Sequence, residues 1–156
     1  MGELFHRYIG NYRYYATIVR VKQVVFLCTG NSARSQMAEG WANHFAKGAI
    51  RFLSAGTNPA KVVNAKAIAV MGERGIDISS HKPKTLNSVQ GPIDLIVAVC
   101  SQAAEQCPAP GPEFQIERWD LPDPAAAEGT DDEVLAVFRA SRDDIERRVR
   151  DLVARL

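Results

Sequence analysis

Three cysteines could carry nucleophilic or redox chemistry, and the first of them has the richest surroundings. Cys28 ends an apolar run and is followed directly by Thr29, Gly30, Asn31, Ser32, Ala33, Arg34 and Ser35. Glycine allows a tight turn and asparagine tolerates a left-handed backbone, so successive N–H groups can converge on an anion. A following helix adds its positive dipole end, and an arginine pairs two oxygens of a tetrahedral oxyanion. We therefore predict an oxyanion-binding loop over residues 29–34.

The same donors would activate Cys28. Groups that attract an oxyanion also stabilise a thiolate, and this lowers the pKa of a cysteine. The thiolate is the nucleophile, so Cys28 is predicted to attack the central atom of the bound oxyanion. The spacing from Cys28 to Arg34 is weak evidence by itself, since a buried structural cysteine can precede an arginine by chance. A strand before the loop, Gly, Asn and Ser within it and a helix after it make the chemical interpretation much more specific.

The elements around this loop alternate between strand and helix. Short apolar runs predict strands at Gln23–Cys28, Ile50–Ala55, Ile93–Val99 and Phe114–Trp119. Apolar residues at helical spacing predict helices at Ser35–Lys47, at Asn64–Arg74, and from a capping box at Thr130 and Glu133 onward. Such alternation predicts a single-domain, three-layer α/β/α fold with a four-stranded parallel sheet. Ligands bind at the carboxyl ends of parallel strands, which is where Cys28 lies.

Composition narrows the functional classes. The chain has 156 residues, enough for one domain, and a formal net charge of +1, which disfavours nucleic-acid binding. No apolar stretch is long enough to span a membrane. An odd count of three cysteines favours the reducing cytoplasm over a secreted disulfide framework, and their spacing does not fit a metal site. Residues 1–20 hold all four tyrosines and are expected to form an extension that packs on a catalytic domain of residues 21–156.

The segment VVFLCTGNSARSQMAEG resembles the phosphate-binding loop of the low-molecular-weight protein tyrosine phosphatase superfamily. Within that group the chain looks most like the arsenate reductases that small thiol proteins recycle. The resemblance covers roughly residues 22–153 and includes SAGT at 54–57, GIDIS at 75–79 and WDLPDPA at 119–125. It implies a fold like that of the low-molecular-weight phosphotyrosine phosphatases. It also implies that Ser35 hydrogen-bonds the Cys28 thiolate.

The resemblance also implies a general acid. Asp123, followed by Pro124, matches the family's acid in its Asp-Pro setting, although Asp120 stays open on pattern alone. Related phosphatases place aromatic residues after this pair to flank a phenyl ring. Here three alanines follow at 125–127, and alanine cannot stack on a ring. A small inorganic oxyanion needs no such wall.

Cys100 and Cys107 distinguish a reductase from a phosphatase, which needs one thiol. Their spacing matches the redox pair of thioredoxin-coupled arsenate reductases, whereas two buried structural cysteines would need no special spacing. The residues between them favour a short helix, and thiols at its two ends would lie about 10.5 Å apart along the axis. A disulfide tolerates Cα separations only up to about 7 Å. We therefore expect residues 100–108 to unwind when the pair is oxidised.

The resemblance thus implies arsenate reduction by a relay from Cys28 to Cys100 to Cys107, in the service of arsenic detoxification. No cofactor is expected to stay bound. The electrons would come from an external thiol reductant, for which thioredoxin fits best and a glutaredoxin with glutathione, or mycothiol, stays open. Phosphate or sulfate is expected to compete with arsenate. The alternatives are a phosphatase for tyrosine or small phosphoesters and a non-catalytic binding module.

One departure from the family concerns potassium. Some of these reductases bind it near the loop, at positions matching Asn31 and Glu39 and at oxygen ligands after the GIDIS segment. Here that segment continues His81-Lys82-Pro83-Lys84. A lysine ammonium cannot ligate potassium but can replace its charge. We therefore expect no metal site, with Lys82 or Lys84 in its place.

Overall fold

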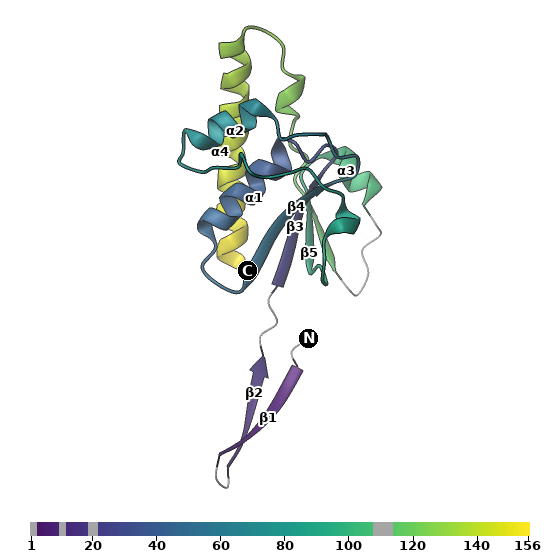
Figure 1. The fold of residues 1–156 in the computed structure, drawn as a ribbon, viewed down its shortest axis with the longest axis vertical. Coiled ribbons are helices and arrows are strands. Elements are labelled where there is room, and N and C mark those ends of the chain that lie inside the picture. Colours follow the sequence, from purple (N-terminus) through teal and green to yellow (C-terminus); the bar gives the residue numbers. More distant parts are fainter. Residues whose placement is uncertain (1–2, 10–11, 19–21, 108–113) are drawn as a thin grey trace.

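The structure is a computed structural model that describes residues 3–9, 12–18, 22–107 and 114–156, with side-chain detail from residue 22 onward. Its centre is a parallel sheet of four strands, in the order β4-β3-β5-β6 (Figure 1). The strands are β3 (Lys22–Cys28), β4 (Ile50–Gly56), β5 (Leu95–Ala98) and β6 (Gln115–Arg118). The predicted α/β fold with a four-stranded parallel sheet is confirmed.

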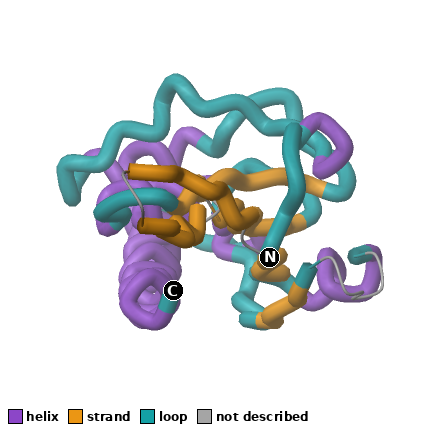
Figure 2. Tube along the Cα trace, turned by 90° about the horizontal axis from the view of Figure 1, so that it is seen from below, coloured by secondary structure: helices purple, strands orange, loops and turns teal. Residues whose placement is uncertain are grey.

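Helices follow the strands as predicted, with small shifts at their ends. The four α-helices are α1 (Arg34–Phe45), α2 (Ala65–Gly72), α3 (Ser101–Gln106) and α4 (Asp131–Arg155). Two short 3₁₀ helices are η1 (Leu86–Ser88) and η2 (Pro124–Ala126). Helices α1, α2 and α4 pack on one another, whereas α3 contacts β3 and β5. Figure 2 shows α4 nearly end-on beside the strands, with the C-terminus at its near end.

The central position of β3 explains its composition. Strands β4 and β5 pair with it on either side, and every residue from Gln23 to Cys28 is buried. A parallel strand covered on both faces reads as a continuous apolar run rather than an alternating one. Phe26 is fully buried and its ring stacks against Phe52, 6.2 Å between centroids. Burial of such a side chain contributes about 1.5–3 kcal/mol, and it fixes the strand that ends in Cys28.

Two predicted helix caps are present. The Asn64 side chain accepts hydrogen bonds from the N–H groups of Lys66 and Ala67, at 2.8 and 3.3 Å. Thr130 accepts one from the N–H of Glu133 at 3.2 Å, which is half of the predicted capping box. The other half differs, because the Glu133 carboxylate accepts from the Thr130 hydroxyl rather than from its backbone. Each cap satisfies an N–H group that the first helical turn leaves unpaired.

The N-terminal segment forms a separate antiparallel pair of strands, β1 (Glu3–Ile9) and β2 (Tyr12–Ile18). Leu4 pairs with Thr17 and Ile9 with Tyr12. The expected packing of residues 1–20 on the domain involves side chains outside the described part of the chain. Across the described residues, no helix combines the length and the apolar character needed to cross a membrane.

Candidate functional site

Most carbonyl groups of the loop between β3 and α1 accept hydrogen bonds from the segment that follows β4. Asn31 adopts a left-handed backbone with φ 48°, the conformation that the sequence suggested for it. The carbonyls of Cys28, Thr29, Gly30 and Ser32 accept backbone hydrogen bonds of 2.8–3.0 Å from Thr57, Asn58, Ala60 and Asn64. In a trans peptide the N–H points opposite to the C=O. The N–H groups that follow these carbonyls therefore point the opposite way, which is the arrangement found in anion-binding nests.

Cys28 lies beneath this nest with two hydrogen-bond donors on its sulfur. It is 3% exposed, and its Sγ accepts from the Asn31 N–H at 3.0 Å. The Ser35 hydroxyl lies 2.8 Å from the same sulfur. Asn31 Nδ2 donates to Ser35 Oγ at 2.9 Å, which links the serine to the loop. The Cys28 sulfur therefore has hydrogen-bond partners from both the loop and the first turn of α1.

Arg34 and Asp123 stand at the mouth of the loop. One Arg34 nitrogen donates to the Leu121 carbonyl at 2.8 Å, and the other lies 3.9 Å from the Asp123 carboxylate. A pocket of about 270 Å³ brings both side chains together with Cys28. Asp120, the alternative acid, lines a neighbouring pocket with Cys100 but does not line the Cys28 pocket. Of the two candidate acids, Asp123 is therefore the one that lines the pocket with Cys28.

Cys100 and Cys107 occupy the two ends of α3, as the sequence predicted. Cys100 precedes the helix, is 4% exposed, and its Sγ lies 3.7 Å from the hydroxyl of Thr29. Thr29 directly follows Cys28, so the second thiol lies next to the oxyanion loop. Cys107 ends the helix and is partly exposed. Burial raises the pKa of Cys107, and the positive charge of Arg118 opposes that rise. All three cysteines are free thiols.

A buried polar cluster lies behind the loop. Asn31 Oδ1 accepts from the Lys84 backbone N–H at 3.0 Å, and the Lys84 ammonium lies 3.9 Å from the Glu39 carboxylate. Ser54 also donates a hydrogen bond to Glu39. The residues present do not fit potassium, because the ammonium stands beside the carboxylate that would otherwise ligate the ion. Of the two candidate lysines, the geometry selects Lys84.

Three side chains at the site were not assigned roles from the sequence. Asn64 and Gln102 line the Cys28 pocket, and Gln102 accepts a hydrogen bond from Thr29 at 3.3 Å. Gln36 is fully buried and donates to the Asn31 carbonyl at 3.1 Å. The sequence marked Asn64 only as a helix cap. Its only indication for Gln102 was the position two residues after Cys100. Gln36 carries no sequence signal of its own.

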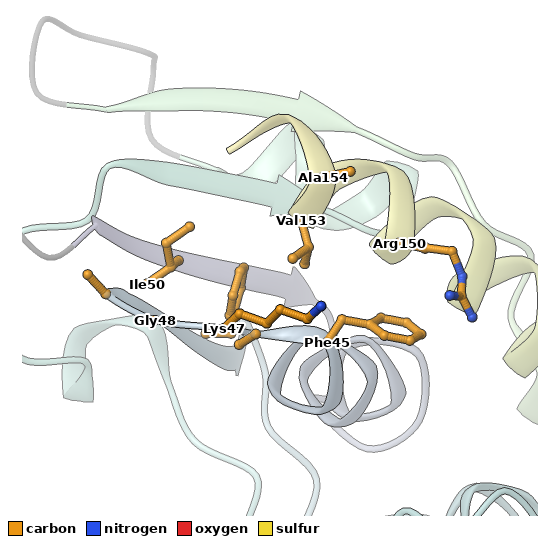
Figure 3. A pocket seen from close by; sticks show the side chains of 10 residues that line it. Phe45, Lys47, Gly48, Ile50, Arg150, Val153 and Ala154 are labelled. Atoms are coloured by element: carbon orange, nitrogen blue, oxygen red, sulfur yellow. The ribbon is translucent and has the colours of Figure 1, made fainter.

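A larger, more apolar pocket lies at the far end of the sheet (Figure 3). Its volume is about 430 Å³, and Phe45, Ile50, Phe52 and Val153 contribute its apolar walls. The Arg150 guanidinium stacks over the Phe45 ring at 4.4 Å and pairs with Glu146. The described residues that line this pocket include no cysteine and no carboxylate, so it lacks the groups that the chemistry of the Cys28 pocket requires.

Comparison with known proteins shows the family to which the chain belongs. The family model of the low molecular weight phosphotyrosine protein phosphatases matches residues 23–156. An arsenate reductase of Bacillus subtilis (strain 168) is 42% identical over 131 residues, which cover 83% of this chain and 94% of the relative. A solved arsenate reductase in its oxidised state superposes with a TM-score of 0.73 at 33% identity, covering 86% of this chain and 98% of that one.

A second similar structure is that of an enzyme whose reductant is known. It is the thioredoxin-dependent arsenate reductase of Corynebacterium glutamicum, with a TM-score of 0.66 and 26% identity. The likeness covers 86% of this chain and 61% of that one.

Proposed function

Because the chain belongs to the low molecular weight phosphotyrosine protein phosphatase family, we propose that its phosphatase-like loop serves the reduction of arsenate to arsenite. The observation that carries the proposal is the placement of a second buried thiol, Cys100, within 3.7 Å of the residue that follows Cys28. A phosphatase needs only the first thiol. We assign the chemistry to residues 21–156, with residues 1–20 as an extension.

The first step is attack on arsenic. Arsenate enters the nest of N–H groups from residues 29–34, where Arg34 moves from the Leu121 carbonyl to pair with its oxygens. The Cys28 thiolate, held by Ser35 and Asn31, attacks arsenic. Asp123 donates the proton that lets one oxygen leave as water. The product is a covalent sulfur–arsenic(V) adduct.

The second step moves two electrons to arsenic. The Cys100 thiolate attacks Cys28 sulfur, a disulfide forms between them, and the electron pair of the sulfur–arsenic bond leaves on arsenic as arsenite. Cys107 then attacks Cys100, which moves the disulfide to the 100–107 pair and restores the Cys28 thiolate. The net change is one arsenate and two thiols converted to arsenite, one disulfide and water.

Selectivity for arsenate would come from this redox step. Phosphate and sulfate have the tetrahedral shape and charge that the same nest accepts, and we expect both to compete for binding. Phosphorus does not accept two electrons from a thiol, so a phosphate adduct would not be resolved by Cys100. Inorganic phosphate is therefore expected as an inhibitor and not as a substrate.

A protein dithiol is the reductant that suits the last disulfide. Unwinding of α3 would carry the 100–107 pair outward, where thioredoxin or a glutaredoxin-like protein reaches it. We favour thioredoxin, because a three-thiol relay ends in an intramolecular disulfide that a dithiol reduces directly. We expect the enzyme to act in the cytoplasm, because such reductants keep thiols reduced there. No bound cofactor is required.

The test is arsenate-dependent oxidation of NADPH in the presence of thioredoxin and thioredoxin reductase. We expect steady turnover, and its loss in Cys107→Ala. Hydrolysis of an aryl phosphate ester in the same preparation, without turnover of arsenate, would overturn the proposal in favour of a phosphatase. Binding of arsenate with neither activity would indicate a binding module.

A further inference from the structure

One carbonyl in the oxyanion loop is held differently from its neighbours. The carbonyls of Cys28, Thr29, Gly30 and Ser32 are each held by a backbone N–H of the segment after β4. The Asn31 carbonyl is held instead by a side chain, the Nε2 group of Gln36, at 3.1 Å. Gln36 lies in the first turn of α1 and is fully buried, so water does not compete for this bond. A single side chain thus completes a series that is otherwise made by the backbone.

The orientation of this one peptide group decides where an N–H group points. The Asn31 carbonyl shares its peptide plane with the Ser32 N–H, and in a trans peptide the two point in opposite directions. Gln36 draws the carbonyl away from the loop, which turns the Ser32 N–H toward the pocket that Cys28, Ser32 and Arg34 line. If the peptide turned over, a carbonyl oxygen would face the bound anion.

His81 fixes the direction of the Gln36 amide. The Asn31 carbonyl only accepts hydrogen bonds, so the Gln36 atom facing it is the nitrogen, and its oxygen faces the other way. That oxygen lies 2.9 Å from His81 Nδ1, which must therefore carry the hydrogen. A chain of two hydrogen bonds then runs from His81 through Gln36 to the loop.

We propose that Gln36 and His81 are positioning residues that hold the peptide between Asn31 and Ser32 in the anion-binding orientation. The inference deepens the proposed function, because it names what sets the affinity of the same site for tetrahedral oxyanions. Neither side chain touches the substrate. Their effect passes through a single backbone N–H.

This mechanism affects oxyanion binding but not the hydrogen bonds to the Cys28 sulfur, whereas a general distortion of the loop would change both. The Asn31 N–H, which donates to Cys28 sulfur, belongs to the preceding peptide and is not held by Gln36. Loss of the two hydrogen bonds made by Gln36, which we call the clamp, should therefore weaken oxyanion binding while the Cys28 thiolate keeps its donors. Two measurements follow, the Kd for inorganic phosphate and the rate at which iodoacetamide alkylates Cys28.

The first variant is Gln36→Met, which keeps the volume of the side chain and removes the donor. Loss of one neutral hydrogen bond predicts a rise of about five- to tenfold in the Kd for phosphate, measured by calorimetry on the reduced protein. The KM for arsenate should rise similarly. Alkylation of Cys28, followed by mass spectrometry of its peptide, should change by less than about twofold. Gln23→Met is the matched control, because Gln23 is a buried glutamine that donates to the Gln90 carbonyl at the opposite end of β3.

Two variants of His81 test the outer bond. His81→Asn keeps an N–H donor near the position of Nδ1 and should bind phosphate within about twofold of the parent. His81→Leu removes the donor and should weaken binding about two- to fivefold. Thermal unfolding establishes that each variant is folded. Because phosphate binding requires no reduction, this test is independent of whether the chain turns over arsenate.

The proposal is overturned if folded Gln36→Met binds phosphate within twofold of the parent. It is also overturned if Cys28 alkylation falls in parallel with phosphate affinity, since that result indicates general distortion of the loop. Equal losses in His81→Asn and His81→Leu would remove His81 from the clamp.

Discussion

The Lys84 ammonium lies 3.9 Å from the Glu39 carboxylate, and the Lys84 backbone N–H holds the side chain of Asn31. Lys84 therefore occupies the space beside Glu39 with a positive charge of its own. We predict that activity is the same in potassium and sodium chloride at constant ionic strength. A several-fold rise on adding potassium would contradict this prediction. Lys84→Ala should destabilise the protein by about 1–3 kcal/mol, because it removes the positive charge beside the buried Glu39 carboxylate and leaves it with the Ser54 hydrogen bond.

The relay predicts different products from two cysteine variants in the absence of a reductant. Cys107→Ser should release one arsenite per protein and stop with a disulfide between Cys28 and Cys100. Cys100→Ser should release none, because the adduct on Cys28 has no thiol to resolve it. Mass spectrometry of the quenched proteins, with arsenite measured in the supernatant, distinguishes these states. Equal arsenite release from both variants would exclude the proposed order of the thiols.

Helix α3 should melt when its terminal cysteines join. Cys100 and Cys107 stand at the two ends of a six-residue helix. The distance between the two ends exceeds the Cα separation that a disulfide allows. Amide exchange at residues 101–106 should therefore be faster in the oxidised protein than in the reduced protein. The exchange of α4 serves as an internal control, since α4 packs on α1 and α2. Equal protection of α3 in both states would show that the pair closes without unwinding.

The final thiol step should accelerate as pH rises. Burial raises the pKa of Cys107, so at neutral pH a smaller fraction of it is thiolate than in an exposed cysteine. Its alkylation rate in the reduced protein should increase about tenfold per pH unit up to that raised pKa. Arg118→Gln removes the charge that opposes the rise and should slow alkylation further. A pH profile matching that of a free cysteine would contradict the prediction.

Gly56 should not tolerate a side chain. A Cβ at this position would lie 2.6 Å from the Thr29 carbonyl oxygen and 3.0 Å from the Asn31 nitrogen. Gly56→Ala should push the loop inward, destabilise the protein by about 1–3 kcal/mol and weaken phosphate binding. Gly72→Ala is the control, since a Cβ there meets nothing within 4 Å and should be neutral or slightly stabilising. Equal phosphate affinity in both variants would refute the prediction.

The parts of the site that are local in sequence could be predicted from it. The loop from Cys28 to Arg34, the left-handed Asn31 and the helix between Cys100 and Cys107 each follow from neighbouring residue types. The choice between Lys82 and Lys84 could not be made, because it depends on how a loop approaches Glu39 from the far side of β4. The choice between Asp120 and Asp123 likewise needed the shape of the pocket.

Gln36 and the N-terminal strands were not predicted from the sequence, for two different reasons. The apolar spacing of Met37, Trp41 and Phe45 predicts which face of α1 meets the core, and it indicates nothing about Gln36. Gln36 is fully buried and contacts Asn31 and His81, which lie in two loops outside α1, and helical periodicity does not reveal such contacts. Strands β1 and β2, in contrast, flank the dipeptide Gly10-Asn11 in the sequence, and such a dipeptide is a signal for a hairpin.

The bonds from Thr57, Asn58, Ala60 and Asn64 continue the pairing of β3 with β4 beyond the last residues of both strands. The oxyanion loop is in this sense an edge of the folded core rather than an appended surface loop. It should share the cooperative unfolding of the sheet, so its amides should exchange only when the domain unfolds. A substitution that breaks one of these four bonds should therefore lower the stability of the whole domain as well as the affinity of the loop for oxyanions.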